Sequence, residues 1–252
     1  MQATTTAQPL RAYTHSTHTK PDVLALMREH KRLDHIIQGT YTKGTGADFK
    51  GCLVGCAIGG DHMLFEPAFG IPWRLAWLAD DIFEGLSPAA AADFAVDFFD
   101  AIEPGADLSR VYDGWCAWML GDPTDGLVTI GTEPSVAAMA ALFARAAVGD
   151  EPSEDEWEAT GKAAWAAWDA RDVWAARAAR AARDARDVWA ARDARAARDA
   201  RDARDVWAAR DAWAARDVWA ANQRYALLRL LSLAAGAGTF TNPAPATSEG
   251  QP

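Results

Sequence analysis

The chain alternates between segments with helical spacing of apolar residues and short segments rich in glycine or proline. In PDVLALMREHKRLDHIIQG, residues 21–39, apolar side chains recur at intervals of three and four residues. Because proline favours the first turn of a helix and glycine its end, the pattern predicts a helix from Pro21 to Gly39. The next stretch, TYTKGTGADFKGCLVGCAIGG, alternates β-favouring residues around glycines and predicts a hairpin over residues 40–58.

More helices are expected where aspartate, proline or serine precedes an apolar periodic run. Asp61 is expected to cap a short helix that ends at Pro67 and Gly70, and Pro72 to open one that ends at Gly85. Three others are expected over residues 88–102, 108–120 and 134–147. The predicted fold class is mainly α: a small helical domain with a short β-hairpin, followed by a long Ala-rich helix or helices.

Residues 165–221 form 19 triplets in which every Trp and every Arg occupies the first position. We call this segment the triplet array. Alanine and arginine favour α-helix, in which a period of three moves successive first positions about 60° around the axis. The Trp and Arg side chains therefore follow a spiral, which excludes a conventional long coiled coil. Expansion of a nine-base unit that yields a tolerated helix is an alternative origin of the pattern.

Several indoles in the triplet array would be exposed on an isolated helix. Large exposed apolar side chains favour association, so we expect the array to pack on itself, on its own domain or on a partner. The residues expected to make these contacts are Trp174, Trp189, Trp207, Trp213 and Trp219.

Changes in composition divide the chain into four expected parts. Residues 1–20 lack periodicity and are expected to be a flexible lead-in, and residues 21–150 hold most of the large apolar side chains. A triplet-repeat helical arm is expected over residues 151–236, beginning at Ser153 and Glu156, which have capping-box spacing. The composition of residues 237–252 favours a disordered tail.

The charge is unevenly distributed along the chain. The net charge is -10, but the array contains 12 Arg and 10 Asp, so the remaining residues carry a charge of -12. An acidic surface repels phosphate backbones and anionic lipids, which disfavours nucleic-acid and membrane partners and favours basic ones. Arg and Trp in the array have the chemistry to clamp and stack nucleic acid, but the neighbouring aspartates oppose it.

Cysteine content and hydropathy indicate the compartment. Three cysteines, an odd and small number, do not suggest a disulfide framework. The first 20 residues contain no apolar core of signal-peptide length, and no run of about 18 uncharged apolar residues occurs. These features predict a cytoplasmic protein without a membrane span.

The candidate chemistry gathers in GCLVGCAIGGDHMLFE, which contains Cys52, Cys56, His62 and Glu66. One cysteine has the chemistry of a thiolate nucleophile, with His62 as base and a carboxylate orienting it. Alternatively the cysteines and His62 supply three zinc ligands, with a fourth from Cys116 or His35. In the third alternative the cysteines are small apolar core residues and the glycines permit tight packing.

Two further groups of residues are candidates for a site. Asp80 and Glu84 are helical neighbours beside Asp81, as in paired acid–base or metal-binding carboxylates, although a solvated helix face fits the same spacing. Tryptophans at helical spacing are typical of a core or an interface rather than a cofactor site, and no cofactor is predicted. These tryptophans are Trp73, Trp77, Trp115 and Trp118.

Several short motifs together resemble a family of uncharacterised bacterial and phage proteins. They are HIIQGTY, GCLVGCAI, FGIPWRLAWLADDIFEGL and EPGADLS, with His62 and Glu66, followed by an Ala-rich triplet tail. The resemblance covers about residues 30–120 and the style of the tail, which in the relatives contains more Ser and Glu. It implies a bacterial or phage cytoplasmic setting and assigns no catalytic residue.

The sequence favours a non-enzymatic interaction or scaffolding protein that associates with itself or with a protein partner. The alternative is a small enzyme or metal-binding protein that uses Cys52, Cys56 and His62.

Overall fold

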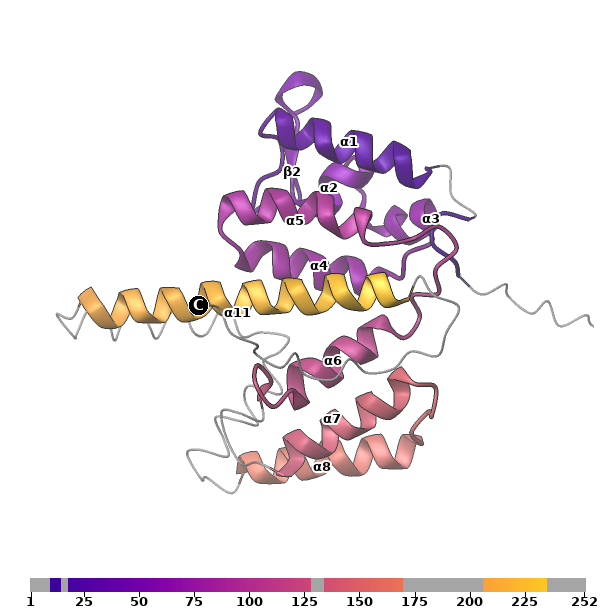
Figure 1. Ribbon diagram of the computed structural model, residues 1–252, viewed down its shortest axis with the longest axis vertical. Helices are drawn as coiled ribbons and strands as arrows, with labels where there is room; N and C mark the ends of the chain where they lie inside the picture. Colours follow the sequence, from indigo (N-terminus) through magenta and orange to yellow (C-terminus); the bar gives the residue numbers. More distant parts are fainter. Residues whose placement is uncertain (1–9, 15–17, 128–133, 170–205, 235–252) are drawn as a thin grey trace, which may run out of the picture. The chain divides into compact units, whose positions relative to one another are not determined.

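The computed structural model describes residues 10–14, 18–127, 134–169 and 206–234 (Figure 1). In this part of the chain the structure is mainly α-helical, with one short two-stranded antiparallel sheet. The predicted fold class is therefore confirmed. The expected tail and most of the triplet array, including Trp174 and Trp189, lie outside the described residues, as do the side chains of Trp207 and Trp213.

The chain divides into two compact units. Of the described residues, 10–14, 18–112 and 224–234 belong to the first, and 113–127, 134–169 and 206–223 to the second. This division differs from the single globular domain expected over residues 21–150. Hydrophobic periodicity identifies helices, but it does not indicate which helices share a core.

The packed part of the first unit begins earlier than expected. Ala12 and Tyr13 are buried, and the Ala12 amide donates to the Ala106 carbonyl at 3.1 Å. The Tyr13 hydroxyl donates to the carbonyl of Phe99 at 3.3 Å. The expected flexible lead-in over residues 1–20 is thus wrong for these residues, because a single buried tyrosine anchors a segment without any periodicity.

Helix α1 (Lys20–Arg32) is shorter than the predicted helix, which was expected to end at Gly39. Asp34 has a positive φ of 53°, which turns the chain out of the helix. The chain then runs extended, and Ile36 forms an isolated parallel bridge with Gly51. The isoleucines after Asp34 satisfy helical spacing, but their backbone hydrogen-bonds to another segment instead.

The predicted hairpin exists but occupies only part of residues 40–58. Strands β1 (Thr42–Lys43) and β2 (Lys50–Gly51) pair antiparallel, and the connection contains the short 3₁₀ helix η1 (Gly46–Asp48). The rest is helix α2 (Leu53–Ile58), which corrects the prediction. Cys52 starts this helix because its sulfur accepts a hydrogen bond from the Gly55 amide at 3.3 Å.

The helices expected after Asp61 are confirmed. Asp61 caps the 3₁₀ helix η2 by accepting the Met63 amide, and Gly70 ends α3 with a φ of 65°. Ser87 precedes α5, whose first residue is a proline. The bounds are His62–Leu64 for η2, Phe65–Phe69 for α3, Trp73–Gly85 for α4 and Pro88–Asp100 for α5.

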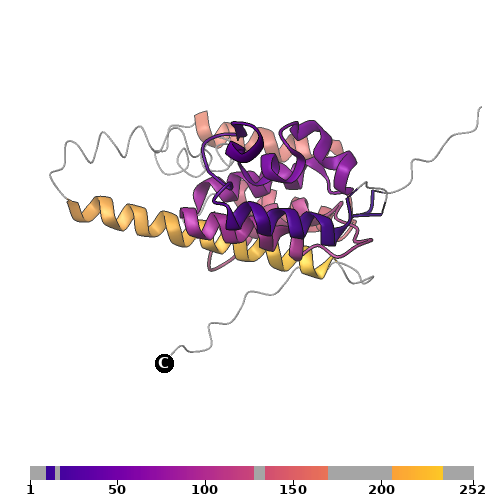
Figure 2. The same cartoon turned by 90° about the horizontal axis from the view of Figure 1, so that it is seen from above.

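The first unit is built from helices stacked around a phenylalanine core. Helix α1 lies along α5, α5 packs on α4, and α2 packs on both α1 and α4 (Figures 1 and 2). Aromatic rings from α3 and α5 meet in the interior. The fully buried phenylalanines are Phe65, Phe69, Phe83, Phe94, Phe98 and Phe99.

The second unit contains α6 (Val111–Gly121), which begins at the division, α7 (Pro134–Ala147) and α8 (Glu154–Asp169). Helix α7 packs against α8, where the rings of Phe143 and Trp157 meet edge-on with centroids 4.9 Å apart. The expected capping box is confirmed, since Ser153 and Glu156 exchange side-chain and backbone hydrogen bonds.

Helix α11 (Val206–Leu233) contains the end of the triplet array and continues beyond it. In the second unit, Trp219 stacks on Trp118 with ring centroids 6.2 Å apart and an interplanar angle of 21°. In the first unit, Arg224 pairs with Asp97. Among the helices that the structure describes, none combines the length and the apolar character needed to cross a membrane.

Candidate functional site

Cys52 and His62 are the two predicted site residues that the structure brings together. Cys52 lies at the start of α2, and the Nε2 atom of His62 lies 3.7 Å from its sulfur. Asp61 positions His62 by capping the 3₁₀ helix η2. The pair therefore has the separation of a weak sulfur hydrogen bond, the geometry that a base needs to approach a thiol.

Asp80 approaches the same thiol from α4. Its Oδ1 atom is buried and has no hydrogen-bond partner in the described part of the chain. Burial raises the pKa of Asp80 to about 6, although hydrogen bonds from the Cys52 thiol and the Val54 amide act in the opposite direction. The carboxylate is thus charged at neutral pH in a poorly solvated position.

The surroundings hold Cys52 in its protonated form. Burial raises the pKa of the Cys52 thiol far above its usual range, and the charge of Asp80 raises it further. Burial also lowers the pKa of His62, whose ring meets the edge of Tyr41 at a centroid distance of 4.4 Å. At neutral pH the cluster is a neutral thiol, a neutral imidazole and a carboxylate, so nucleophilic chemistry would require a change in its environment.

The other two predicted residues, Cys56 and Glu66, have separate structural contacts. The Cys56 thiol donates to the carbonyl of Gly51 at 3.4 Å, and burial raises its pKa to about 12. The Oε2 atom of Glu66 accepts the amide of Trp73 at 2.8 Å, at the start of α4. The four residues are close in the sequence, but Cys56 and Glu66 form hydrogen bonds with Gly51 and Trp73 and not with the pair of Cys52 and His62.

The metal site and the carboxylates of α4 are the other candidates that the sequence suggested. Across the described ranges, no three His, Cys, Asp or Glu side chains are grouped to hold a metal ion. Of the three carboxylates noted on α4, Glu84 accepts the Gly39 amide with both oxygens, at 3.0 and 2.9 Å. Gln38 donates to the carbonyls of Phe83 and Leu86. The end of α4 therefore holds the segment that leads into the hairpin.

The start of α4 exposes two indoles. Trp73 is 51% exposed and Trp77 59%, and their rings meet at right angles with centroids 5.7 Å apart. The opposite face of α4 buries Leu75, Leu78 and Ile82 in the core, so the two tryptophans lie on the outer side. Their exposure excludes the core role that sequence spacing also allowed.

Other exposed apolar side chains come from the neighbouring segments. Met63 and Leu64 of η2 are 84% and 51% exposed, and Tyr41, in contact with His62, is 66% exposed. The Glu66 hydrogen bond to Trp73 ties this segment to α4. We call the exposed, mutually packed pair Trp73 and Trp77 the aromatic surface.

Sequence analysis missed the aromatic surface and the contact between Asp80 and Cys52. The signal for the surface was present, because Trp73 and Trp77 fall outside the apolar stripe of their own helix. The contact of Asp80 joins two helices separated along the chain, and no local pattern specifies it.

Comparison of the chain with protein-family models, with curated proteins and with solved structures gave no match.

Proposed function

We propose that this chain is a non-enzymatic interaction protein that associates through the aromatic surface with a basic, apolar helical segment. The observation that carries the proposal is the pair of exposed, mutually packed indoles of Trp73 and Trp77. Monomeric proteins rarely leave several large apolar side chains exposed together, and tryptophan is enriched among residues that dominate binding energy.

The chemistry of the partner follows from the charges beside the aromatic surface. Asp81 and Glu84 are exposed one and two turns after Trp77 on α4, and the guanidinium of Arg74 already lies over the Trp73 ring at 5.8 Å, which shows that this indole accepts a cation. Outside the triplet array the chain carries a charge of -12. A partner with arginine or lysine beside apolar side chains complements this surface in both charge and hydrophobicity.

The chain's own triplet array has that chemistry. It contains arginine and tryptophan at intervals of three residues, with alanine, aspartate and valine between them, and its 12 Arg and 10 Asp leave a charge of +2. Association of the array of one molecule with the aromatic surface of another would produce self-association, and Trp174 and Trp189 would be contact residues. A cytoplasmic setting agrees with the free, buried thiols of Cys52 and Cys56.

The test measures binding of a synthetic peptide with the sequence of residues 186–221 to the full chain by fluorescence anisotropy. We expect saturable binding that the double variant Trp73→Ser, Trp77→Ser weakens by about tenfold or more, as for typical hot-spot residues. Tyr225→Ser removes an aromatic side chain that is 61% exposed on α11, and it is the matched control that leaves binding unchanged.

Light scattering over a range of concentrations provides the second measurement. The full chain should form dimers or larger species, and the double tryptophan variant should shift this equilibrium towards the monomer. A chain that stays monomeric at high concentration and does not bind the peptide would contradict the proposal, as would equal binding by the double variant and the tyrosine control.

A second candidate function is a thiol-dependent enzyme with Cys52 as nucleophile and His62 as base. The unpartnered buried oxygen of Asp80 beside this pair favours it, because unsatisfied buried polar atoms are concentrated at functional sites. The raised pKa of Cys52 opposes it. A saturable loss of thiol reactivity on addition of a substrate, abolished by Cys52→Ala, would distinguish this candidate from the interaction protein.

A further inference from the structure

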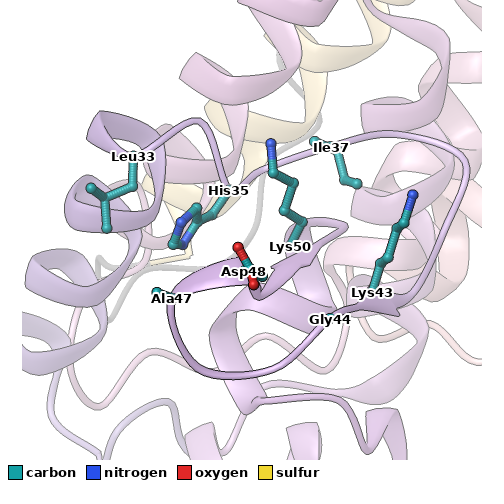
Figure 3. Close-up of a pocket in the computed structure, with 8 residues that line it drawn as sticks. All are labelled: Leu33, His35, Ile37, Lys43, Gly44, Ala47, Asp48 and Lys50. Atoms are coloured by element: carbon teal, nitrogen blue, oxygen red, sulfur yellow. The ribbon is translucent and has the colours of Figure 1, made fainter.

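The hairpin and the chain segment after α1 enclose an open pocket of about 660 Å³ (Figure 3). This volume lies within the range of sites for small molecules. Leu33, Ile37 and Ala47 provide apolar groups around it, and the remaining lining is polar. The pocket is separate from the Cys52 cluster and from the aromatic surface.

Two lysines define the charge of the pocket. Lys43 and Lys50 are directly opposite one another in the antiparallel register, and both line the pocket. Like charges in this position destabilise a strand pair. In the described part of the chain neither ammonium group forms an ion pair, so an anion bound between them would relieve the repulsion.

The other polar groups limit which anion fits. Asp48 also lines the pocket, and Figure 3 shows its carboxylate between His35 and Lys50. The two lysines and Asp48 together give the lining a formal charge of +1, which favours an anionic ligand. The Nδ1 atoms of His30 and His35 lie 3.3 Å apart, so a hydrogen bond between them orients the His35 ring.

The loop that forms one rim of the pocket is held in place by its backbone. Gly44 has a φ of 72°, and a Cβ atom there would lie 2.3 Å from the carbonyl oxygen of Asp48. Only glycine allows this close approach, which brings Asp48 back towards the strands. A rim that is already formed lowers the entropic cost of binding.

We propose that this pocket binds a small amphipathic anion, a molecule with one carboxylate or phosphate group and an apolar tail. The anionic head lies between Lys43 and Lys50, and the tail contacts Leu33, Ile37 and Ala47. This binding function is independent of the proposed association through the aromatic surface.

The experiment is a titration of the full chain with hexanoate, hexyl phosphate, hexanol and hexylamine, followed by amide chemical shifts in NMR spectra. Saturable shifts of Gly44, Asp48 and Lys50 with the two anions, and none with hexanol or hexylamine, are expected. Tighter binding of hexanoate would assign a carboxylate head, and tighter binding of hexyl phosphate a phosphate head.

Variants test the assignment of charges. Lys43→Gln and Lys50→Gln should each weaken anion binding by about fivefold, the effect of a partly exposed ion pair of about 1 kcal/mol. Asp48→Asn should strengthen it. Lys162→Gln is the matched control, because it changes the net charge equally at an exposed lysine paired with Glu158 on α8, and it should have no effect.

Three results would overturn the proposal: no saturable shift with either anion, hexanol acting as strongly as hexanoate, or lysine variants in the pocket behaving like Lys162→Gln. Far-UV circular dichroism verifies that each variant remains folded. Lys43 is exposed and Lys50 half-buried, and glutamine keeps most of the aliphatic part of each side chain.

Discussion

Replacing Asp80 by asparagine should stabilise the protein at neutral pH. The substitution keeps the shape of the side chain and an oxygen that accepts a hydrogen bond from the Cys52 thiol, but it removes the buried charge. The Oδ1 atom of Asp80 has no hydrogen-bond partner among the described residues, so no specific contact of that atom is lost. The only large change is the desolvation of a carboxylate.

The magnitude follows from the pKa of Asp80, which burial raises from 3.8 to about 6. Because the folded state binds this proton more tightly than the unfolded state, the contribution of Asp80 to stability falls as the pH rises from about 4 to about 6. Above pH 7 the accumulated loss is about 3 kcal/mol. The variant should therefore exceed the wild type by up to this amount at neutral pH and equal it near pH 4.

Urea denaturation at a series of pH values measures this difference directly. The difference between the two proteins isolates Asp80, because the other titrating groups contribute equally to both. Asp22→Asn provides a control of opposite sign. Hydrogen bonds from Thr19 lower the pKa of Asp22, so its contribution is present at neutral pH and is lost on acidification. That variant should be less stable than the wild type at neutral pH and approach it in acid.

A pH-independent difference between Asp80→Asn and the wild type would refute this reasoning, even if the variant were more stable. Such a result would mean that Asp80 is as well solvated in the folded state as in the unfolded one. Destabilisation at neutral pH would also refute it, since it would show that the charge itself makes a favourable contact.

Two further predictions concern the same region. Gly55→Ala should destabilise the chain by about 1–3 kcal/mol in urea denaturation, because its Cβ atom would lie 2.0 Å from the Tyr41 carbonyl oxygen. Gly161→Ala, in helix α8 with open space around it, should instead stabilise the chain by about 0.5–1 kcal/mol. If both substitutions destabilise the chain, the clash with the Tyr41 carbonyl is not the cause of the effect at Gly55. Iodoacetamide at pH 8 should label Cys52 and Cys56 much more slowly than a model thiol, because burial raises the pKa of both thiols. Mass spectrometry of the intact protein measures the labelling, and fast labelling of either cysteine would contradict the prediction.

Local signals in the sequence were sufficient to predict the positions of most helices. The helices that begin after Pro72 and at Pro88 and Pro134 were located by the proline at their start, and Gly85 correctly marked the end of α4. The same rules placed the end of α1 too late, because Ile36 has the right spacing for a helix and no glycine interrupts the chain before residue 39. The signal that mattered was Asp34, a residue that tolerates the left-handed conformation better than most.

The candidate site was less predictable than the fold. Cysteine is not a typical helix cap, so nothing in the sequence indicated that Cys52 starts α2. The approach of His62 depends on a cap by Asp61, which was predicted, but that of Asp80 depends on the packing of two helices. The exposure of Trp73 and Trp77 was predictable by contrast, because both lie outside the apolar stripe of α4.

The close approach of α2 to the hairpin changes how the motif GCLVGC should be used to recognise other chains of this design. Cβ atoms at Gly51 and Gly55 would lie 2.8 and 2.0 Å from the Tyr41 carbonyl oxygen, whereas Cys52 acts through a cap that serine or aspartate performs at least as well. In a library of variants selected only for folding, the two glycine codons should therefore accept fewer replacements than the codon of Cys52. A search pattern for this architecture is better written as two glycines four residues apart, the first at the end of the second hairpin strand, with the cysteine positions left open.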